Sequence, residues 1–163
     1  MTSLALRRPT CGDVLGPTRG FRRARFRCSC AEWFPIICGI PRSVGSDGYA
    51  GPSGQEWNHF PRTQGDSANG TRIRYQRFRQ VTRVEPESLC AGQGLEAGSE
   101  TGRFLAPLGI AGVLGCAADL SVATDAAAES LREHGSCKVR QARVHDTPFS
   151  GDFDLVFSLG VRH

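Results

Sequence analysis

The sequence has no apolar run long enough to cross a membrane. Its longest apolar stretch, residues 104–118, is interrupted by three glycines and Pro107, whereas a membrane-spanning helix needs about 20 consecutive apolar residues. The first ten residues, MTSLALRRPT, also lack the apolar segment of a secretory signal. We therefore expect a cytoplasmic protein that has no membrane partner.

The sequence also lacks the cysteine pairing of a structural zinc site. Such sites usually take their ligands from two pairs of cysteines or histidines, each pair about two to four residues apart. Here Cys28 and Cys30 are separated by one residue, the cysteine count of 7 is odd, and the 4 histidines share no metal-ligand spacing. The pattern favours reduced thiols, and we predict no metal ligands.

Lysine is almost absent, since Lys138 is the only one and all other cationic residues are arginines. The arginines are unevenly distributed. Residues 1–84 hold 14 arginines against 5 acidic residues, whereas residues 85–163 hold 5 arginines and the lysine against 11 acidic residues. This asymmetry predicts a basic N-terminal region joined to an acidic domain.

Residues 1–70 show little periodicity and many chain breakers, part of a total of 20 Gly and 9 Pro. We predict that this region is poorly ordered or irregular. Two arginine-rich segments that contain aromatic residues, 19–27 and 71–84, suit the binding of RNA or another polyanion. Their arginines would contact phosphates, and their aromatic rings would stack on bases. The alternatives are a solvated arm for the first segment and, for the second, a lead-in helix that packs through Ile73, Gln80 and Val84.

Residues 71–163 alternate between strand-like and helix-like segments. Strands are predicted at 93–97, 113–119, 138–144 and 151–161 from apolar runs or apolar–polar alternation. A short helix is predicted from Arg103, and an alanine-rich helix is predicted at 122–134. This order is typical of an α/β domain with a parallel sheet.

Three motifs in this half carry a resemblance to a known family. GLEAGSETGRFLAPLG, AADLS and HDTPFSGDFDLVFSLGVRH resemble, in order and spacing, the first half of a class I S-adenosylmethionine-dependent methyltransferase of the type 11 group. The resemblance implies an incomplete Rossmann-like sheet with helices on both faces, which binds S-adenosyl-L-methionine. It also implies methyl transfer to a small-molecule or other acceptor in the complete form, and a truncated or inactive chain here.

The resemblance implies roles for residues around the glycine-rich turn. Glu96 would lie near the methionine amino group of the cofactor. Gly98, Ser99 and Gly102 would bring backbone amides around the same moiety. Methyl transfer needs mainly alignment of donor and acceptor, so no catalytic residue is implied.

The resemblance also implies cofactor contacts on the following strands. Asp119 would accept hydrogen bonds from both ribose hydroxyls, an arrangement that suits a carboxylate facing a diol. Leu120 would lie against the adenine, Val144 would flank its edge, and Ser158 would lie at the mouth of the fourth strand.

Two positions depart from the family pattern. Glu100 stands where the family has its central glycine, and Arg143 stands where an acidic residue usually ends the third strand. A dinucleotide-dependent dehydrogenase is the competing interpretation, but its G-x-G-x-x-G fingerprint does not match residues 98–103. An arginine-rich RNA-binding or polyanion-binding protein without catalysis is the alternative from a different functional class.

Overall fold

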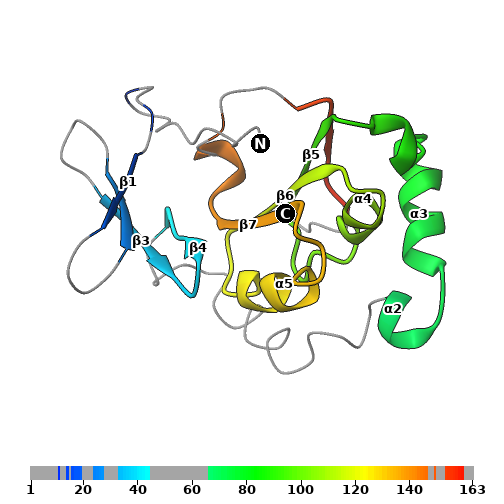
Figure 1. Cartoon of the computed structure of the whole chain (residues 1–163), viewed down its shortest axis with the longest axis horizontal. Coiled ribbons are helices and arrows are strands. Elements are labelled where there is room, and N and C mark those ends of the chain that lie inside the picture. The colour runs from blue at the N-terminus through cyan, green and yellow to red at the C-terminus, as the bar shows by residue number, and fades with distance from the viewer. Residues whose placement is uncertain are drawn as a thin grey trace.

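The computed structural model describes residues 11, 14, 16–19, 24–27, 33–44, 66–146, 149 and 153–159. They form a small antiparallel sheet beside a larger α/β unit (Figure 1). The antiparallel sheet has the order β1-β2-β3-β4 and consists of β1 (Gly16–Arg19), β2 (Ala24–Arg27), β3 (Trp33–Ile37) and β4 (Ile40–Pro41). Phe21, Arg22 and Arg23 of the first arginine-rich segment lie outside the described residues, as do Cys28 and Cys30.

The larger sheet is parallel and has the order β7-β6-β5-β8. Its strands are β5 (Gln93–Ala97), β6 (Leu114–Asp119), β7 (Cys137–Gln141) and β8 (Leu155–Phe157). Helix α4 (Ala106–Ile110) connects β5 to β6, and α5 (Thr124–Ser130) connects β6 to β7. The predicted α/β class and parallel sheet are therefore confirmed, and the strand order is compatible with a Rossmann-like fold.

Four further elements precede or join these units. They are α2 (Asp66–Asn69), α3 (Ile73–Thr82) and two short 3₁₀ helices, η1 (Pro86–Leu89) and η2 (Val144–Asp146). Helix α3 is the lead-in helix that we expected for the second arginine-rich segment, but its packing face differs from the prediction. Ile73 is 58% exposed, and Phe78 is the buried residue of the helix.

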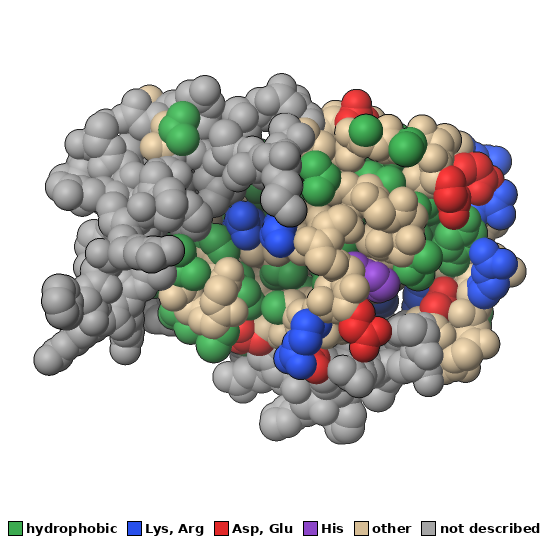
Figure 2. Space-filling view, in the orientation of Figure 1, with side chains coloured by type: hydrophobic (Ala, Val, Ile, Leu, Met, Phe, Trp, Pro, Cys, Tyr) green, Lys and Arg blue, Asp and Glu red, His purple; other side chains and the backbone are tan. Residues whose placement is uncertain are grey.

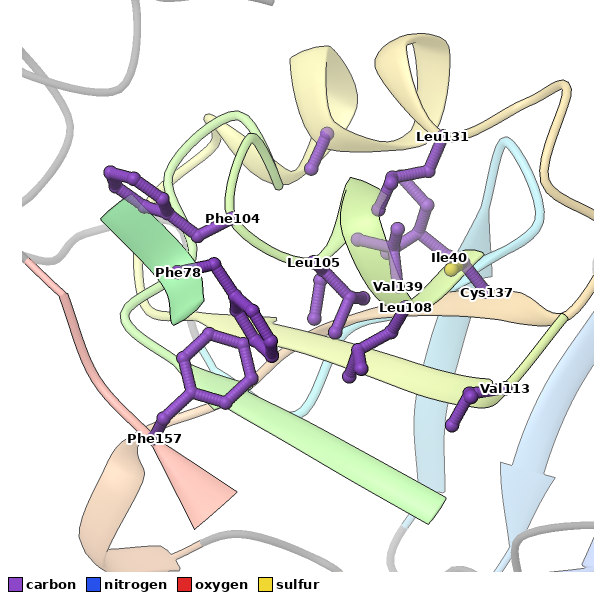
Figure 3. Close-up of a cluster of buried hydrophobic side chains, with 12 residues drawn as sticks. Ile40, Phe78, Phe104, Leu105, Leu108, Val113, Leu131, Cys137, Val139 and Phe157 are labelled. Atoms are coloured by element: carbon purple, nitrogen blue, oxygen red, sulfur yellow. The ribbon is translucent and has the colours of Figure 1, made fainter. Parts of the chain in front are cut away.

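One face of the parallel sheet is covered by α3, α4 and α5. Their side chains meet those of the sheet in a single cluster (Figure 3), in which the rings of Phe78 and Phe157 pack edge to face with centroids 5.2 Å apart. Close packing explains the glycine in β5, because a Cβ on Gly94 would lie 2.4 Å from Leu108 Cδ1. A side chain at that position would force the Leu108 side chain to move.

The opposite face of the sheet carries a smaller cluster. Leu95, Cys116 and Ala118 are buried there beside Phe149 and Phe153. We expected helices on both faces, but the helices among the described residues contribute to the first cluster and not to this one. No described helix is long and apolar enough to span a membrane.

The antiparallel sheet is attached to the α/β unit through Arg42. This residue forms an isolated parallel bridge to Gln141 at the end of β7, and its buried guanidinium donates to Thr124 Oγ1 (3.1 Å) and Gln141 Oε1 (2.9 Å) and pairs with Asp125 (2.5 Å). Ile40 joins the main core cluster. These contacts cross the boundary that we expected at residue 70, and through them residues 40–43 pack against the α/β unit.

Candidate functional site

The eight residues singled out from the sequence lie at one edge of the parallel sheet. Glu96 is in β5, Asp119 ends β6, and Ser158 directly follows β8. The carboxyl ends of parallel strands meet at the same edge, and in open α/β sheets ligands bind in the crevice where the strand order reverses. In this sheet the reversal lies between β5 and β8. The remaining residues follow these strands or β7, and they are Gly98, Ser99, Gly102, Leu120 and Val144.

Glu96 is the most buried acidic residue of this edge, with 1% of its surface exposed. Neither carboxylate oxygen has a partner at hydrogen-bond geometry among the described residues; the Leu105 amide donates to the Gly102 carbonyl (3.1 Å) but lies near enough to Glu96 to favour its charged form. Burial raises the pKa of Glu96 well above its usual range, and the positive charge of Arg103 only partly opposes this. Buried polar groups are normally hydrogen-bonded, so Glu96 has capacity for a ligand donor.

Ser99 adds a second buried polar group with unused capacity. It is 2% exposed, and its hydroxyl has no partner among the described residues. Ser99 lies three residues beyond Glu96, in the turn that leaves β5. The two side chains together supply acceptors and one hydroxyl donor at the start of the turn.

Asp119 holds the ends of β5 and β6 together. Its Oδ2 accepts a hydrogen bond from the Glu100 amide (2.8 Å), and its Oδ1 accepts two from the amide and hydroxyl of Ser121 (both 2.7 Å). A carboxylate has about four lone-pair sites, so Asp119 retains acceptor capacity. The residue is 8% exposed, which leaves a small part of it open at the sheet edge.

The backbone amides of the turn have internal partners. The amides of Gly98 and Ser99 donate to the Ala118 carbonyl (2.7 and 3.2 Å), and that of Gly102 donates to the Ser99 carbonyl (2.8 Å). The resemblance implied that these amides surround a ligand, whereas in this conformation they close the turn and join it to β6. These three amides are therefore not available to a ligand in this conformation.

The two glycines of the turn are required by backbone conformation and packing. Gly98 has φ 71° and Gly102 has φ 69°, values in the left-handed region that favours glycine. A Cβ on Gly102 would also lie 2.7 Å from Leu131 Cδ1. Gly102 thus allows the turn to pack closely against the residue that ends α5.

Glu100 has the same left-handed conformation without being glycine, with φ 48°. Its carboxylate pairs with the Arg103 guanidinium at 2.8 Å, in an i,i+3 arrangement. Burial raises the pKa of Glu100, the charge of Arg103 opposes this, and Asp119 adds to the rise. Arg103 therefore only partly offsets the negative charge at the departure from the family pattern.

Arg103 and Arg74 were not singled out from the sequence. Both guanidiniums lie over the ring of Phe104, at 5.3 Å for Arg103 and 5.7 Å for Arg74. They bring positive charge from α3 and from the turn to the carboxyl end of β5. The spacing of Glu100 and Arg103 is the only local signal for this arrangement.

The outer part of the edge is open to solvent. Leu120 is 36% exposed and Val144 is 49% exposed, and Ser158 is also exposed. These residues lie at the sheet edge as expected, but they do not form a closed pocket among the described residues. Within the residues that the structure describes, no group of three or more His, Cys, Asp or Glu residues could hold a metal ion.

Comparison with known proteins identifies no family. No protein-family model matches the chain, and no curated protein matches it either.

Proposed function

We propose that the carboxyl edge of β5 and β6 binds S-adenosyl-L-methionine, as in a methyltransferase-like protein. The observation that carries this is the pair of acidic side chains on neighbouring strand ends: Glu96, buried and without a hydrogen-bond partner, and Asp119, with acceptor capacity left. A ligand with a cationic donor and a neighbouring diol would satisfy both.

The available groups fit this cofactor through side chains. Glu96 and the Ser99 hydroxyl would hold the amino-acid end, and Asp119 would accept from the ribose hydroxyls. Leu120 and Val144, both partly exposed, would lie along the adenine. When bound, the cofactor would supply a methyl group on a positively charged sulfur for transfer to a nucleophilic acceptor.

Recognition would depend little on the amides of Gly98, Ser99 and Gly102, because these already have acceptors. The positive charge needed beside the carboxylate of the ligand would come from Arg103, which now pairs with Glu100. Binding would therefore compete with the Glu100–Arg103 ion pair. We infer weak binding in the present sequence and tighter binding once Glu100 is removed.

Isothermal titration with S-adenosyl-L-methionine tests this assignment. We expect heat of binding for the wild type, tighter binding for Glu100→Gly, and about tenfold weaker binding for Asp119→Asn, since a charge-assisted bond is roughly twice as strong as a neutral one. Glu133→Gln is the matched control, because Glu133 is an exposed acid away from this edge. Its affinity should equal that of the wild type.

Two results would overturn the assignment. The first is the absence of binding in both the wild type and Glu100→Gly at millimolar ligand. The second is tighter binding of NADH than of S-adenosyl-L-methionine, which would favour the dehydrogenase interpretation.

A further inference from the structure

The outer surface of helix α3 takes no part in the cofactor site. The helix packs on the α/β unit through Phe78, and five exposed polar residues follow one another on its other side. Their positions are i, i+4, i+7, i+8 and i+11, which aligns them along one stripe. This arginine–glutamine stripe consists of Arg72, Gln76, Arg79, Gln80 and Arg83. Figure 2 shows basic side chains together with acidic ones at the right-hand rim, over the position of α3 in Figure 1.

A groove runs along part of the stripe. It has a volume of ≈ 390 Å³ and is lined by four of the five stripe residues together with Glu85. All of its lining side chains are polar or charged. The guanidinium and amide groups of this lining suit an anionic, hydrogen-bonding ligand.

The charge along this surface is positive despite two nearby glutamates. The stripe holds three arginines, and Glu85 and Glu87 lie beside it, which gives a net charge of +1. Glu85 pairs with Arg79, and Glu87 accepts hydrogen bonds from the Tyr75 hydroxyl (3.1 and 3.2 Å). Both glutamates thus have partners within the surface. A polyanion would meet an excess of guanidinium groups.

Tyr75 arranges two of these guanidiniums. That of Arg72 lies 4.7 Å from the ring centroid and that of Arg79 lies 5.8 Å from it. The ring attracts both through cation–π interaction, which limits the freedom that each side chain loses on binding. A guanidinium plane also serves as a stacking surface for an unpaired base.

We propose that the arginine–glutamine stripe binds single-stranded RNA. Arg79 and Arg83 contact phosphates, bases stack on the Arg72 guanidinium, and Gln76 and Gln80 contact ribose. Glutamine amides both donate and accept hydrogen bonds, as the 2′-hydroxyl does, and this chemistry favours RNA over DNA. The stripe acts without S-adenosyl-L-methionine, so its test is independent of the cofactor proposal.

The test compares two triple variants of the full chain that remove the same charge. Arg72→Gln/Arg79→Gln/Arg83→Gln removes the stripe, and Arg132→Gln/Lys138→Gln/Arg143→Gln removes three exposed cations elsewhere. Fluorescence anisotropy measures the affinity of each for a labelled oligouridylate of about 20 nucleotides across a series of salt concentrations. Thermal unfolding verifies that both variants fold.

We expect the stripe variant to bind at least about tenfold more weakly at low salt. The slope of log K against log salt should fall by ~1.4, because the phosphate contacts of Arg79 and Arg83 on a single strand contribute about 0.7 each. The control variant should keep the wild-type slope. Equal losses in the two variants, or no binding by the wild type at low salt, would overturn the proposal. Equal affinity for oligothymidylate would overturn the assignment to RNA.

Discussion

The carboxylate of Asp119 at the end of β6 accepts a hydrogen bond from the backbone amide of Glu100, 19 residues earlier in the chain, at 2.8 Å. This bond fixes the turn after β5 to the neighbouring strand. It also keeps Glu100 in the left-handed conformation, with φ 48°. One side chain thus maintains the shape of the turn and lies at the sheet edge where a ligand would bind.

The conformation of Glu100 predicts a difference between two substitutions. Both Glu100→Gly and Glu100→Ala remove the ion pair with Arg103, but only glycine relieves the left-handed backbone, which costs an L-residue about 1 to 2 kcal/mol. We expect the glycine variant to be more stable than the alanine variant by about 1 kcal/mol in urea unfolding. Equal stability of the two would show that the turn relaxes without strain.

Burial of Glu96 predicts an unusual pH dependence of stability. The pKa of this carboxyl is raised in the folded protein, so the unfolded chain loses the proton first as pH rises. Folding stability should therefore fall from about pH 4.5 upward, until the folded pKa is passed. Glu96→Gln removes this loss and should be more stable than the wild type at neutral pH by about 1 to 3 kcal/mol.

Urea unfolding of the wild type and Glu96→Gln between pH 4 and pH 8 measures this effect. The difference in stability between them should grow with pH. Glu133→Gln, at an exposed position, serves as the control and should show no such growth. A variant less stable than the wild type at every pH would mean that the Glu96 carboxylate is stabilised by its surroundings.

The sequence predicted the parts of the fold that depend on local pattern. The strand at 93–97 was predicted with the bounds of β5, and the next two strands shifted by no more than three residues at either end, because apolar runs mark buried strands. The packing of Phe78 and the anchoring of Arg42 could not be predicted. Both depend on contacts between residues far apart in sequence, such as Phe78 with Phe157 and Arg42 with Gln141.

The candidate site also has parts that the sequence indicated and parts that depend on contacts between distant residues. The family resemblance, which rests on the glycine turn and on the motifs at the strand ends, implied which residues meet at the sheet edge. The hydrogen bonds that the Gly98 and Ser99 amides donate within the protein could not be predicted, because their acceptor is the Ala118 carbonyl of the neighbouring strand. The ion pair of Glu100 with Arg103 follows from i,i+3 spacing, but its place beside Glu96 depends on the turn geometry.

Asp66 predicts an acid-sensitive contribution to α3. The helix has no capping side chain at Arg72; instead the Asp66 carboxylate accepts from the Arg74 and Tyr75 amides (2.9 Å each) and from the Thr71 hydroxyl (2.8 Å). Burial raises the pKa of Asp66, but these hydrogen bonds outweigh it and leave the pKa below 3.8. The stabilisation is present above that pH and is lost as pH falls through the folded pKa.

Substitution of Asp66 by alanine should cost about 1 kcal/mol at neutral pH, the usual cost of losing an N-terminal cap. The difference from the wild type should shrink below about pH 4. Helix content by circular dichroism and urea unfolding across this range measure both effects. A difference that stays constant with pH would show that the charge of Asp66 does not contribute to the cap.

The buried guanidinium of Arg42 predicts that the β3–β4 hairpin stabilises the α/β unit. Arg42→Met keeps the aliphatic length but removes the hydrogen bonds to Thr124 and Gln141 and the ion pair with Asp125. Bonds to a charged group contribute about 1.5 to 3 kcal/mol, and Asp125, with 43% of its side chain exposed, is rehydrated. We therefore expect a loss of about 2 kcal/mol in the free energy of unfolding.

Arg132→Met is the matched control for this loss. Arg132 pairs with Glu129 on the same α5 region, but 71% of its side chain is exposed, and exposed ion pairs contribute at most about 1 kcal/mol. A double-mutant cycle of Arg42→Met with Asp125→Asn should give a coupling energy above about 0.5 kcal/mol. If Arg42→Met cost no more than Arg132→Met, the hairpin would not be docked on β7 in solution, and the domain would begin near residue 70 as its composition suggests.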